Sequence, residues 1–420
     1  MDTLTRPVCD TSTPGGGVCV QCMAGRTEQC TGLFPRCDLT TETCAACIDD
    51  NDCGGAAGVC LPDGSCASPD SVIHAVSTGG LADMTSCGGL GAGNSCDLPT
   101  ALAKARTESG IQGSKKNVIK LDDIGPYTTF SNFVVDVDSK FGLVIDAGQA
   151  SLEHNGDGSL VTINAGKGVT IIGGTIQGAH GTGGDGIRCN ASATLTLLGT
   201  KLLMNDESGI DATGCTITVV AAEIRGNTKT GIIVNDGSIE ISRSQLSSNL
   251  GGGITVGDPG KFVIVGNVFL GNGDPAGVVG GLSVATTATG NQLEFNTLAE
   301  NRSMAGLAAG VSCFGTFTAQ NNIVWDNNGP SAIQVSGNCL HAFSDIGPPP
   351  ITGSSLDGGN NLDSDPLFLM PTADLRLNAA TPVRGKANPD ADLTRIASKD
   401  LAGAVRIKPA DLGAYVAPPP

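Results

Sequence analysis

The sequence predicts an all-β fold, a parallel β-helix with three short strands in each coil of about 22 residues. Three observations lead to this prediction: a frame of residues that recurs at this spacing, apolar residues that alternate within it, and Gly, Asn and Asp at its turns. A helical repeat of this length would need an apolar period of about 3.6 and few glycines. The 61 glycines among 420 residues favour turns between strands instead.

The charge balance excludes two classes of partner. Asp and Glu number 41 against 24 Lys and Arg, which gives a formal charge of -17 at pH 7. Such a chain repels phosphate backbones and anionic lipids, so we expect no nucleic acid or membrane-surface partner. The sequence contains no apolar run long enough for a transmembrane segment, and its start, MDTLTRP, lacks the features of a signal peptide. Cations and neutral or cation-bridged glycans remain as ligands.

Residues 1–68 are predicted to form a disulfide-rich module. The cysteine spacing there repeats after a first, clipped copy, and Gly, Asp and Thr fill the loops between. Paired C-x-x-C motifs leave zinc as an alternative, but no histidine lies among them, so we expect disulfides and an oxidising compartment. The cysteines assigned to disulfides are Cys9, Cys19, Cys22, Cys30, Cys37, Cys44, Cys47, Cys53, Cys60 and Cys66.

The end of this module carries a first resemblance. The stretch CAACIDDNDCGGAAGVCLPDGSC resembles the cysteine-rich repeats near the mature N-termini of bacterial surface proteins and lipoproteins. The resemblance implies an extracellular protein or one on the outer surface of a bacterium. We expect the signal or anchor to be missing from this chain, because it begins inside a repeat and stops at APPP.

Residues 69–140 are predicted to form an N-terminal cap and the first strands of the β-helix. Within them, Asp97 is placed to cap a short helix, which we expect to cover the open core. The apolar residues that share one face of this helix are Leu98, Ala101, Leu102 and Ala105. The stretch SCDLPTALAKARTESGIQGSKKNVIKL resembles the segment of secreted β-helix proteins in which a cysteine and a short helix precede the first coil.

Residues 141–345 are predicted to form the coils. MNDESGIDA (204–212) aligns without gaps with GNTKTGIIV (226–234) and SNLGGGITV (248–256). We expect inward aliphatic residues to stack between coils and an asparagine to recur at one corner, where amides bond from coil to coil. The corner series is Asn205, Asn227, Asn249, Asn272, Asn301 and Asn327.

The coils and both flanks resemble the right-handed parallel β-helix proteins of the pectate-lyase-like superfamily, over roughly residues 70–370. This resemblance implies right-handed coils and a ligand along the strand after the asparagine corner. Residues 346–420 are predicted to form a C-terminal cap or anchor-type element. Their segments NNLDSDPLFL, DLRLNAATPV and DLGAYV resemble the C-terminal element of bacterial surface β-helices with a variable choice of anchor.

Alternation assigns the outward residues of the strand after the corner. If Ile187, Ile210 and Ile333 point inward with their equivalents, the next residue of each strand points outward. Apart from Ile233, the predicted ligand-binding face consists of Arg188, Asp211, Thr255, Ser283, Ser312 and Gln334. Its one cation and one anion lie on adjacent coils, which suits an exposed ion pair.

The candidate catalytic residues are Asp206, Glu207, Asp211 and Arg188. A lyase would need several carboxylates for calcium beside an Arg or Lys base, and a hydrolase would need a separated acid and base. The outward row does not supply them, and the NTD and GHG signatures of the superfamily's polygalacturonases are missing. We therefore expect Asp206 and Glu207 to lie on a solvated turn.

No cofactor and no metal site are predicted, and calcium is the one ion left open. Two acidic turns could take it, IDDNDCGG (48–55) and DGGNNLDSDP (357–366), although neither matches the twelve-residue calcium loop. The histidines lie in separate segments, so we expect no metal triad and place them at the surface or at edges: His74, His154, His180 and His341.

Two further disulfides are predicted in the coils. Cys189 with Cys215, and Cys313 with Cys339, have the same separation, and each pair links a strand to the turn of the next coil. The longer coils place their extra residues, AHGTGGDG, GDPAGVVGG and NRSMAGLAAG, between the asparagine corner and the outward row. These insertions either wall a groove or mark a turn that tolerates length.

The interpretation we favour is an exported bacterial surface β-helix with a structural, adhesive or glycan-binding role. We expect a monomer whose partner is an extracellular glycan or a cell-surface molecule. The alternative is an enzyme, a polysaccharide lyase or glycoside hydrolase that acts on an acidic glycan along the outward face. The two hypotheses differ in whether three or more carboxylates meet an Arg or Lys on that face.

Overall fold

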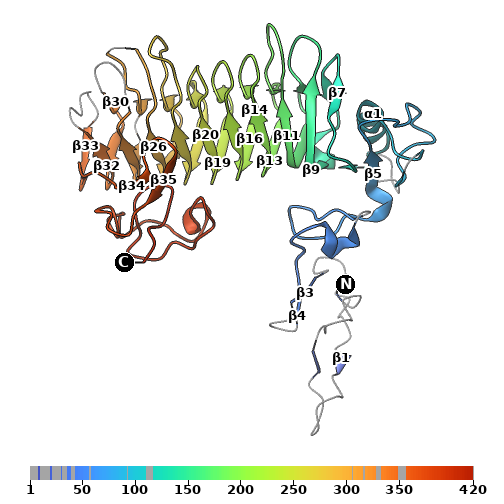
Figure 1. Cartoon of the computed structure of the whole chain (residues 1–420), viewed down its shortest axis with the longest axis horizontal. Coiled ribbons are helices and arrows are strands. Elements are labelled where there is room, and N and C mark those ends of the chain that lie inside the picture. The colour runs from blue at the N-terminus through green and yellow to red at the C-terminus, as the bar shows by residue number, and fades with distance from the viewer. Residues whose placement is uncertain are drawn as a thin grey trace. The chain divides into compact units, whose positions relative to one another are not determined.

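The computed structural model describes residues 8–9, 19–20, 30, 36–38, 43–55, 58–91, 93–109, 117–304, 306–315, 317–327, 333–348 and 356–419. The chain divides into two compact units, residues 1–123 with 143–146 and residues 124–142 with 147–420. Most of the second unit is a stack of coils in which strands run parallel to their neighbours (Figure 1). The domain boundaries drawn from the sequence at residues 68, 140 and 345 stay predictions.

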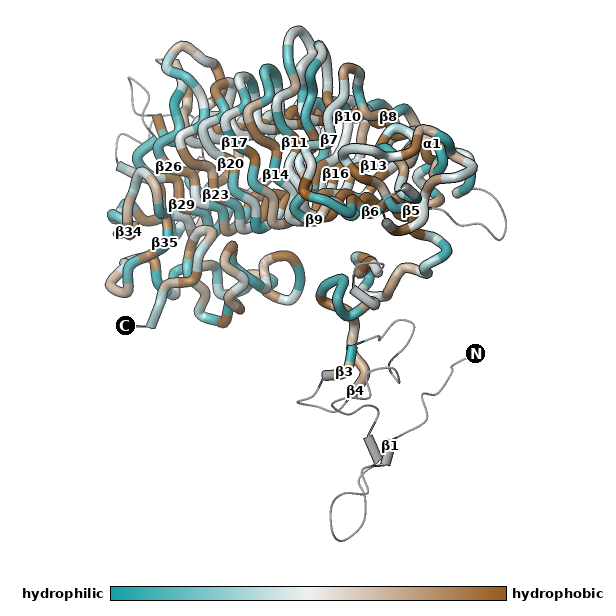
Figure 2. Tube along the Cα trace, turned by 45° about the vertical axis from the view of Figure 1, so that its right-hand side comes forward, coloured by the Kyte–Doolittle hydropathy of each residue, from teal (hydrophilic) through white to brown (hydrophobic). Residues whose placement is uncertain are grey.

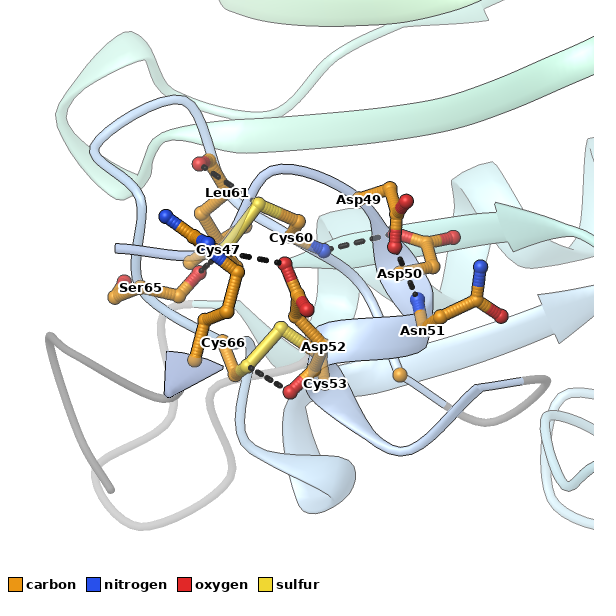
Figure 3. The surroundings of a disulfide bond; sticks show 12 residues. Cys47, Asp49, Asp50, Asn51, Asp52, Cys53, Cys60, Leu61, Ser65 and Cys66 are labelled. Atoms are coloured by element: carbon orange, nitrogen blue, oxygen red, sulfur yellow. Dashed lines mark hydrogen bonds and ion pairs between the residues drawn. A yellow bond between two sulfur atoms is a disulfide. The ribbon is translucent and has the colours of Figure 1, made fainter. Parts of the chain in front are cut away.

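The cysteines of the N-terminal module whose side chains are described are cross-linked. Two short antiparallel hairpins are present, β1 (Val8–Cys9) with β2 (Cys19–Val20) and β3 (Arg36–Asp38) with β4 (Thr43–Ala45). The disulfides are Cys30–Cys44, Cys47–Cys60 and Cys53–Cys66, and Cys37 is also disulfide-bonded. Figure 3 shows the last two pairs around a 3-10 helix, η2 (Asp50–Cys53). Cys22 lies outside the described residues, and only the backbone of Cys9 and Cys19 is described.

The helix predicted after Asp97 is present. Helix α1 (Leu98–Glu108) packs against β5 (Val72–Ala75) and β6 (Val118–Leu121), which are parallel neighbours. The 3-10 helix η4 (Pro69–Ser71) directly precedes β5. The Asp97 carboxylate accepts a hydrogen bond of 2.7 Å from the backbone N–H of Thr100. The four residues of the predicted apolar face are buried. The disulfide Cys87–Cys96, which the sequence did not predict, closes the loop before the helix.

The coils are built from three parallel sheets. The first, here called the ladder sheet, contains β8 (Phe133–Val135), β10 (Val161–Ile163), β12 (Ile187–Cys189), β15 (Ile210–Thr213), β18 (Ile232–Asn235), β21 (Ile254–Val256), β24 (Leu282–Ala285), β27 (Val311–Phe314) and β30 (Val335–Gly337). The second contains β13 (Thr194–Leu198), β16 (Thr216–Val220), β19 (Ser238–Ser242), β22 (Lys261–Val265), β25 (Gln292–Glu294), β28 (Thr318–Gln320), β31 (Leu340–Ala342) and β33 (Leu356–Gly359).

The third sheet contains β14 (Lys201–Leu203), β17 (Glu223–Arg225), β20 (Gln245–Ser247), β23 (Val268–Leu270), β26 (Thr297–Ala299), β29 (Ile323–Trp325) and β32 (Asp345–Gly347). Strand β11 (Gly168–Gln177) belongs to both the second and third sheets, because its two halves pair with β13 and β14. Strand β9 (Leu143–His154) pairs with β6 at its start and with β7 (Tyr127–Thr129) at its end, and η5 (Ser139–Phe141) precedes it.

Alternation within each strand creates the core. Strands β13 and β16 alternate between buried residues and residues that reach solvent, and Figure 2 shows hydrophobic and hydrophilic residues alternating along the coils. The parallel register stacks each inward side chain on its equivalent one coil away. On the ladder sheet the stacked residues are almost completely buried: Ile187, Ile210, Ile232, Ile254, Leu282, Val311 and Val335.

The predicted asparagine ladder is confirmed. In each step from Asn205 to Asn327, the side-chain Nδ2 donates to the next Oδ1 at 2.8 to 2.9 Å, and the same Oδ1 accepts the backbone N–H of the preceding asparagine. All six are buried. A second, shorter ladder, Asn267, Asn296 and Asn322, forms between the second and third sheets and was not predicted.

The prediction that Gln334 faces outward is wrong. Strand β30 pairs Val311 with Val335 and Ser312 with Ser336, so the inward residue is Val335 rather than Ile333. Gln334 is buried, and its Oε1 accepts hydrogen bonds of 3.0 Å from both the backbone N–H and Nδ2 of Asn327. Its side chain therefore ends the asparagine ladder, and Ser336 takes the outward place.

A column of glycines lies beside the asparagine ladder because the coils approach closely there. A Cβ atom at Gly231 would lie 2.6 Å from the carbonyl oxygen of Gly253 and 3.0 Å from Nδ2 of Asn249. Gly209 meets the same two kinds of atom one coil earlier. This contact explains the glycine that recurs in the aligned frames, where a side chain would separate the coils.

The C-terminal residues form a separate element on the outer side of the third sheet. Its parts include the hairpin of β34 (Phe368–Met370) and β35 (Asp374–Leu377) and the 3-10 helix η6 (Ile396–Ser398). Apolar residues of the element pack on Val268 and Ile323, which point away from the core of the coils. The backbone N–H of Ala414 donates 2.9 Å to the Thr297 hydroxyl. The element therefore covers outward apolar surface of the last coils.

We predict that Asn249→Ala lowers the free energy of unfolding by at least about 3 kcal/mol. The substitution leaves the backbone N–H and Nδ2 of Asn227 without their acceptor in a buried site. Urea denaturation measures the loss. Asn235→Ala, at an exposed strand end, is the control and should change stability by no more than about 0.5 kcal/mol. Equal effects of the two substitutions would show that the ladder does not hold the coils together.

Candidate functional site

The outward row of the ladder sheet is the candidate site. In-register pairing places its members one coil apart, at the usual strand separation of about 4.8 Å. All of them reach solvent in part. The row from β10 to β30 is Thr162, Arg188, Asp211, Ile233, Thr255, Ser283, Ser312 and Ser336. Five of the six predicted face residues therefore lie in the row, and Ser336 replaces Gln334.

The charged end of the row contains a residue that the sequence analysis missed. Arg188 Nη2 lies 3.8 Å from the predicted partner, Asp211 Oδ2, but only 2.7 Å from Asp185 Oδ2. Asp185 is buried, and its other oxygen accepts 3.0 Å from the backbone N–H of Ser208. Burial raises the pKa of Asp185 in spite of these hydrogen bonds. The aligned frames could have revealed Asp185, because a carboxylate stands there at the position where the next two coils have Ser208 and Thr230.

The acidic residues that open the aligned frame are each paired. Glu207 forms an ion pair with Lys229 on the next coil. Asp206 Oδ2 accepts 3.0 Å from the backbone N–H of Gly181 and lies 3.5 Å from Nδ1 of His180 on the preceding coil. Asp206 is half exposed and Glu207 less so. These two carboxylates therefore hold neighbouring turns together.

The face joins two carboxylates to one arginine. Asp185 and Asp211 share Arg188, whereas Asp206 and Glu207 are bound to His180 and Lys229. Beyond Asp211 the described row continues with Ile233 and hydroxyl side chains. A lyase would need calcium ligands beside a base, and the row between β18 and β30 supplies neither.

Two groups of cysteine and histidine lie close enough to hold a metal in the described ranges. The first is Cys47, Cys53 and Cys60, and the second is Cys313, Cys339 and His341. The sulfurs of both groups are joined in the disulfides Cys47–Cys60, Cys53–Cys66 and Cys313–Cys339. The second disulfide predicted in the coils, Cys189–Cys215, is also present. A cysteine binds a metal as the thiolate, so the cysteines of these groups are not metal ligands while they are oxidised.

The histidines were predicted to lie at the surface or at edges, and of the four only His180 is exposed. His74, His154 and His341 are buried. His74 Nδ1 lies 2.7 Å from Asp122 Oδ1, and His154 Nδ1 lies 3.1 Å from a backbone carbonyl. His341 takes an inward place in the second sheet beside Cys339, and burial lowers its pKa to about 4. Their burial depends on segments that are distant in the sequence, which spacing alone does not show.

The acidic turn at residues 48–55 uses its carboxylates internally. Asp50 bonds Nζ of Lys120 at 2.6 Å, and Asp52 accepts 2.8 Å from the backbone N–H of Ile48. Asp49 caps η2 through the N–H of Asn51. Desolvation would raise the pKa of Asp50, but its interactions with Lys120, Asp146 and the backbone N–H of Cys60 together outweigh that effect and lower the pKa. The turn is thus a structural link of the first unit.

Comparison with known proteins identifies the coil type. Residues 185–344 match the family model for right-handed β-helix regions. The matched residues run from the turn before β12 through β31, so these coils are right-handed. A crystal structure of the pectate lyase Pel9A is similar, with a TM-score of 0.41 and 12% identity over 83% of this chain and 96% of that chain. None of the curated proteins matches. In the described ranges, no helix is long and apolar enough to cross a membrane.

We predict unequal roles for the two carboxylates that meet Arg188. Asp185→Ala should destabilise the protein by about 2 to 4 kcal/mol, because it leaves the buried Ser208 N–H without its acceptor and removes the nearer carboxylate of Arg188. Asp211→Asn should cost at most about 1 kcal/mol at low salt and less at high salt, since this pair reaches solvent. Urea denaturation at two salt concentrations tests both. A larger loss for Asp211→Asn would reverse the assignment.

A second prediction concerns the acid stability of the coils. The folded pKa of His341, about 4, lies below its ordinary value of 6.5, so its contribution is present above pH 6.5 and is lost as pH falls towards 4. Between pH 6.5 and pH 4 the free energy of unfolding should therefore fall by about 3 kcal/mol less in His341→Leu than in the unmodified chain. Urea denaturation across this pH range measures it, with the exposed His180→Leu as control. An unchanged acid dependence in His341→Leu would contradict the burial of a neutral imidazole.

Proposed function

We propose that the protein is an exported bacterial surface β-helix that binds a neutral or cation-bridged glycan along its ladder sheet without cleaving it. The observation that carries this proposal is the in-register row of hydroxyl side chains: Thr255, Ser283, Ser312 and Ser336. Ser336 Oγ lies 3.4 Å from Ser312 Oγ, so neighbouring hydroxyls are within mutual hydrogen-bond reach. Each can donate one hydrogen bond and accept others, as sugar hydroxyls do.

The geometry of the row suits a polymer of repeating units. Neighbouring strands are about 4.8 Å apart, close to the length of one sugar residue in an extended chain. The row can therefore offer one hydroxyl group to each successive sugar. A charge of -17 disfavours an anionic glycan unless cations bridge the two. A neutral, hydroxyl-rich chain fits the uncharged part of the row.

The insertions beside the row support a binding surface. The two insertions that precede β24 and β27 present exposed apolar side chains, with Val278 67%, Met304 41% and Leu307 37% exposed. The backbone N–H of Met304 donates 2.8 Å to the carbonyl of Gly277, so the two insertions are joined across coils. Apolar groups at the edge of a hydroxyl row can contact the C–H faces of sugar rings.

The location outside the cell rests on the disulfides. In the described part of the chain, disulfides join cysteines both in the N-terminal module and inside the coils. Such cross-links persist in oxidising compartments. The resemblances of the N-terminal repeats and of the C-terminal element support a place on the bacterial surface. A monomer with an extracellular glycan or cell-surface partner follows as part of this proposal.

The enzyme alternative has one observation in its favour. Asp185, whose pKa is raised by burial, and the more exposed Asp211 meet at Arg188. Two carboxylates in different environments are the usual arrangement of a glycoside hydrolase. Each is held by the same guanidinium, however, and Asp185 also binds a backbone N–H, which favours a structural ion pair.

Glycan binding and turnover are measured together. We expect titration calorimetry to detect a neutral polysaccharide, and the substitutions Thr255→Val, Ser283→Ala and Ser312→Ala together to weaken it at least about tenfold. The control is a matched hydroxyl row on the second sheet, changed by Thr194→Val, Thr216→Val and Ser238→Ala, which should leave binding intact. Equal losses for both triple variants would contradict a site on the ladder sheet.

The same samples test the enzyme alternative. We expect no new reducing ends and no unsaturated product from neutral glycans, pectate or alginate, with or without calcium. Turnover that Asp211→Ala abolishes would replace the binding proposal by a lyase or hydrolase.

A further inference from the structure

A buried carboxylate beneath the start of the C-terminal element lacks a partner for one of its oxygens. Asp345, the first residue of β32, has no solvent exposure. Its Oδ1 accepts 3.0 Å from the backbone N–H of Ser364, whereas its Oδ2 has no hydrogen-bond partner among the described residues. A buried carboxylate oxygen without a partner is unfavourable, so a proton or a cation must satisfy it.

Two more carboxylates flank Ser364, the residue whose backbone N–H bonds Asp345. Residues 362–365 add a further rung to the third sheet, because the N–H of Ile346 donates 2.9 Å to the carbonyl of Leu362. Ser364, which bonds Asp345, lies between Asp363 and Asp365 in sequence. Desolvation, and to a lesser degree the charges of these two neighbours, raises the pKa of Asp345 to about 7. No described Lys, Arg or His forms an ion pair with any of the three.

We propose that Asp345, Asp363 and Asp365 bind a divalent cation of the calcium type. Calcium takes six to eight oxygen ligands at about 2.3 to 2.6 Å, from carboxylates, carbonyls and water. The donors are carboxylate oxygens, which suit a hard cation rather than a softer metal. Asp345 supplies a fixed buried ligand. The oxygens of the three carboxylates are not all within 4.8 Å of one another in this structure, so the exposed side chains of Asp363 and Asp365 must turn toward the ion when it binds.

The position of the site gives the cation a structural role. Asp345 belongs to the coils, whereas Asp363 and Asp365 begin the segment that leads into the C-terminal element. That element folds back onto earlier coils, where Asn388 donates 2.7 Å to Asn321 Oδ1 and Gly413 donates 2.9 Å to the Asn321 carbonyl. A cation at Asp345 therefore clamps the first residues of the element to the last coil. Binding to the folded state alone raises its stability.

The test uses the full chain after treatment with a chelator, titrated with CaCl2 alone. We expect one calcium ion per chain by titration calorimetry and a rise of several degrees in the melting temperature. Asp363→Asn with Asp365→Asn should abolish both, yet melt like the unmodified chain in chelator, because the two side chains are exposed. The control is Asp392→Asn, which changes an exposed Asp of the same element. Asp392 accepts a hydrogen bond from the backbone N–H of Thr394, just as Asp365 accepts one from Leu367. This variant should keep the calcium response.

Asp345→Asn separates a cation from a proton. If a proton alone satisfies Asp345, the unmodified chain shows no calcium response, and that result overturns the proposal. A response that survives in the Asp363/Asp365 double variant overturns it as well. With a cation site, Asp345→Asn loses the response but melts no lower than the unmodified chain in chelator, since it removes a buried charge. Glycan binding by the ladder sheet does not depend on this site, so the two proposals fail separately.

Discussion

The hydrogen bond from each corner asparagine to the next fixes the register on which the rest of the coils depends. The amide both donates and accepts, so one residue type can repeat without end along the stack. Aspartate has no donor, and glutamine reaches further, which is why Gln334 appears only where it closes the ladder. Because every step is equivalent, adjacent coils cannot slip by one residue without breaking a buried amide pair.

The same register governs the charges on the outward row. In a parallel stack, equivalent positions lie one strand apart, so a repeated charge would face its own kind at about 4.8 Å. The row avoids this repulsion: Arg188 lies next to Asp211, and the residues that follow are uncharged, beginning with Ile233 and Thr255. Asp185 departs from the pattern, because a carboxylate stands where the next coils have Ser208 and Thr230. It offsets its burial with two hydrogen bonds.

The outer side of the third sheet shows a different solution. Its outward column includes Val268 and Ile323, which would expose apolar surface if they were left uncovered. The C-terminal element covers them with its own apolar residues and is held by hydrogen bonds to Thr297 and Asn321. Asp345 continues this column at the last coil, which explains how a carboxylate comes to be buried there.

The sequence by itself determined the features that repeat. The recurring frame predicted the three parallel sheets, the asparagine ladder and the outward row up to Ser312, and the apolar face with Asp97 predicted the helix α1. These follow from local periodicity, since a residue at a given place in the frame has the same neighbours in each coil. The second ladder, in three coils only, repeats too briefly to be recognised.

The tertiary structure alone decided what does not repeat. Ser336 rather than Gln334 points outward, because Val335 rather than Ile333 pairs with Val311. The aligned frames do not show this shift of two residues. Burial of Asp185, His341 and Asp345 depends on contacts between segments whose spacing in the sequence varies. Arg188 lies closer to Asp185 than to the predicted partner, Asp211. Asp185 belongs to the turn before β12, whereas Asp211 was predicted from its place in a strand. The repeat fixes where backbones lie, whereas the path of each turn selects which side chains lose solvent and which partners they find.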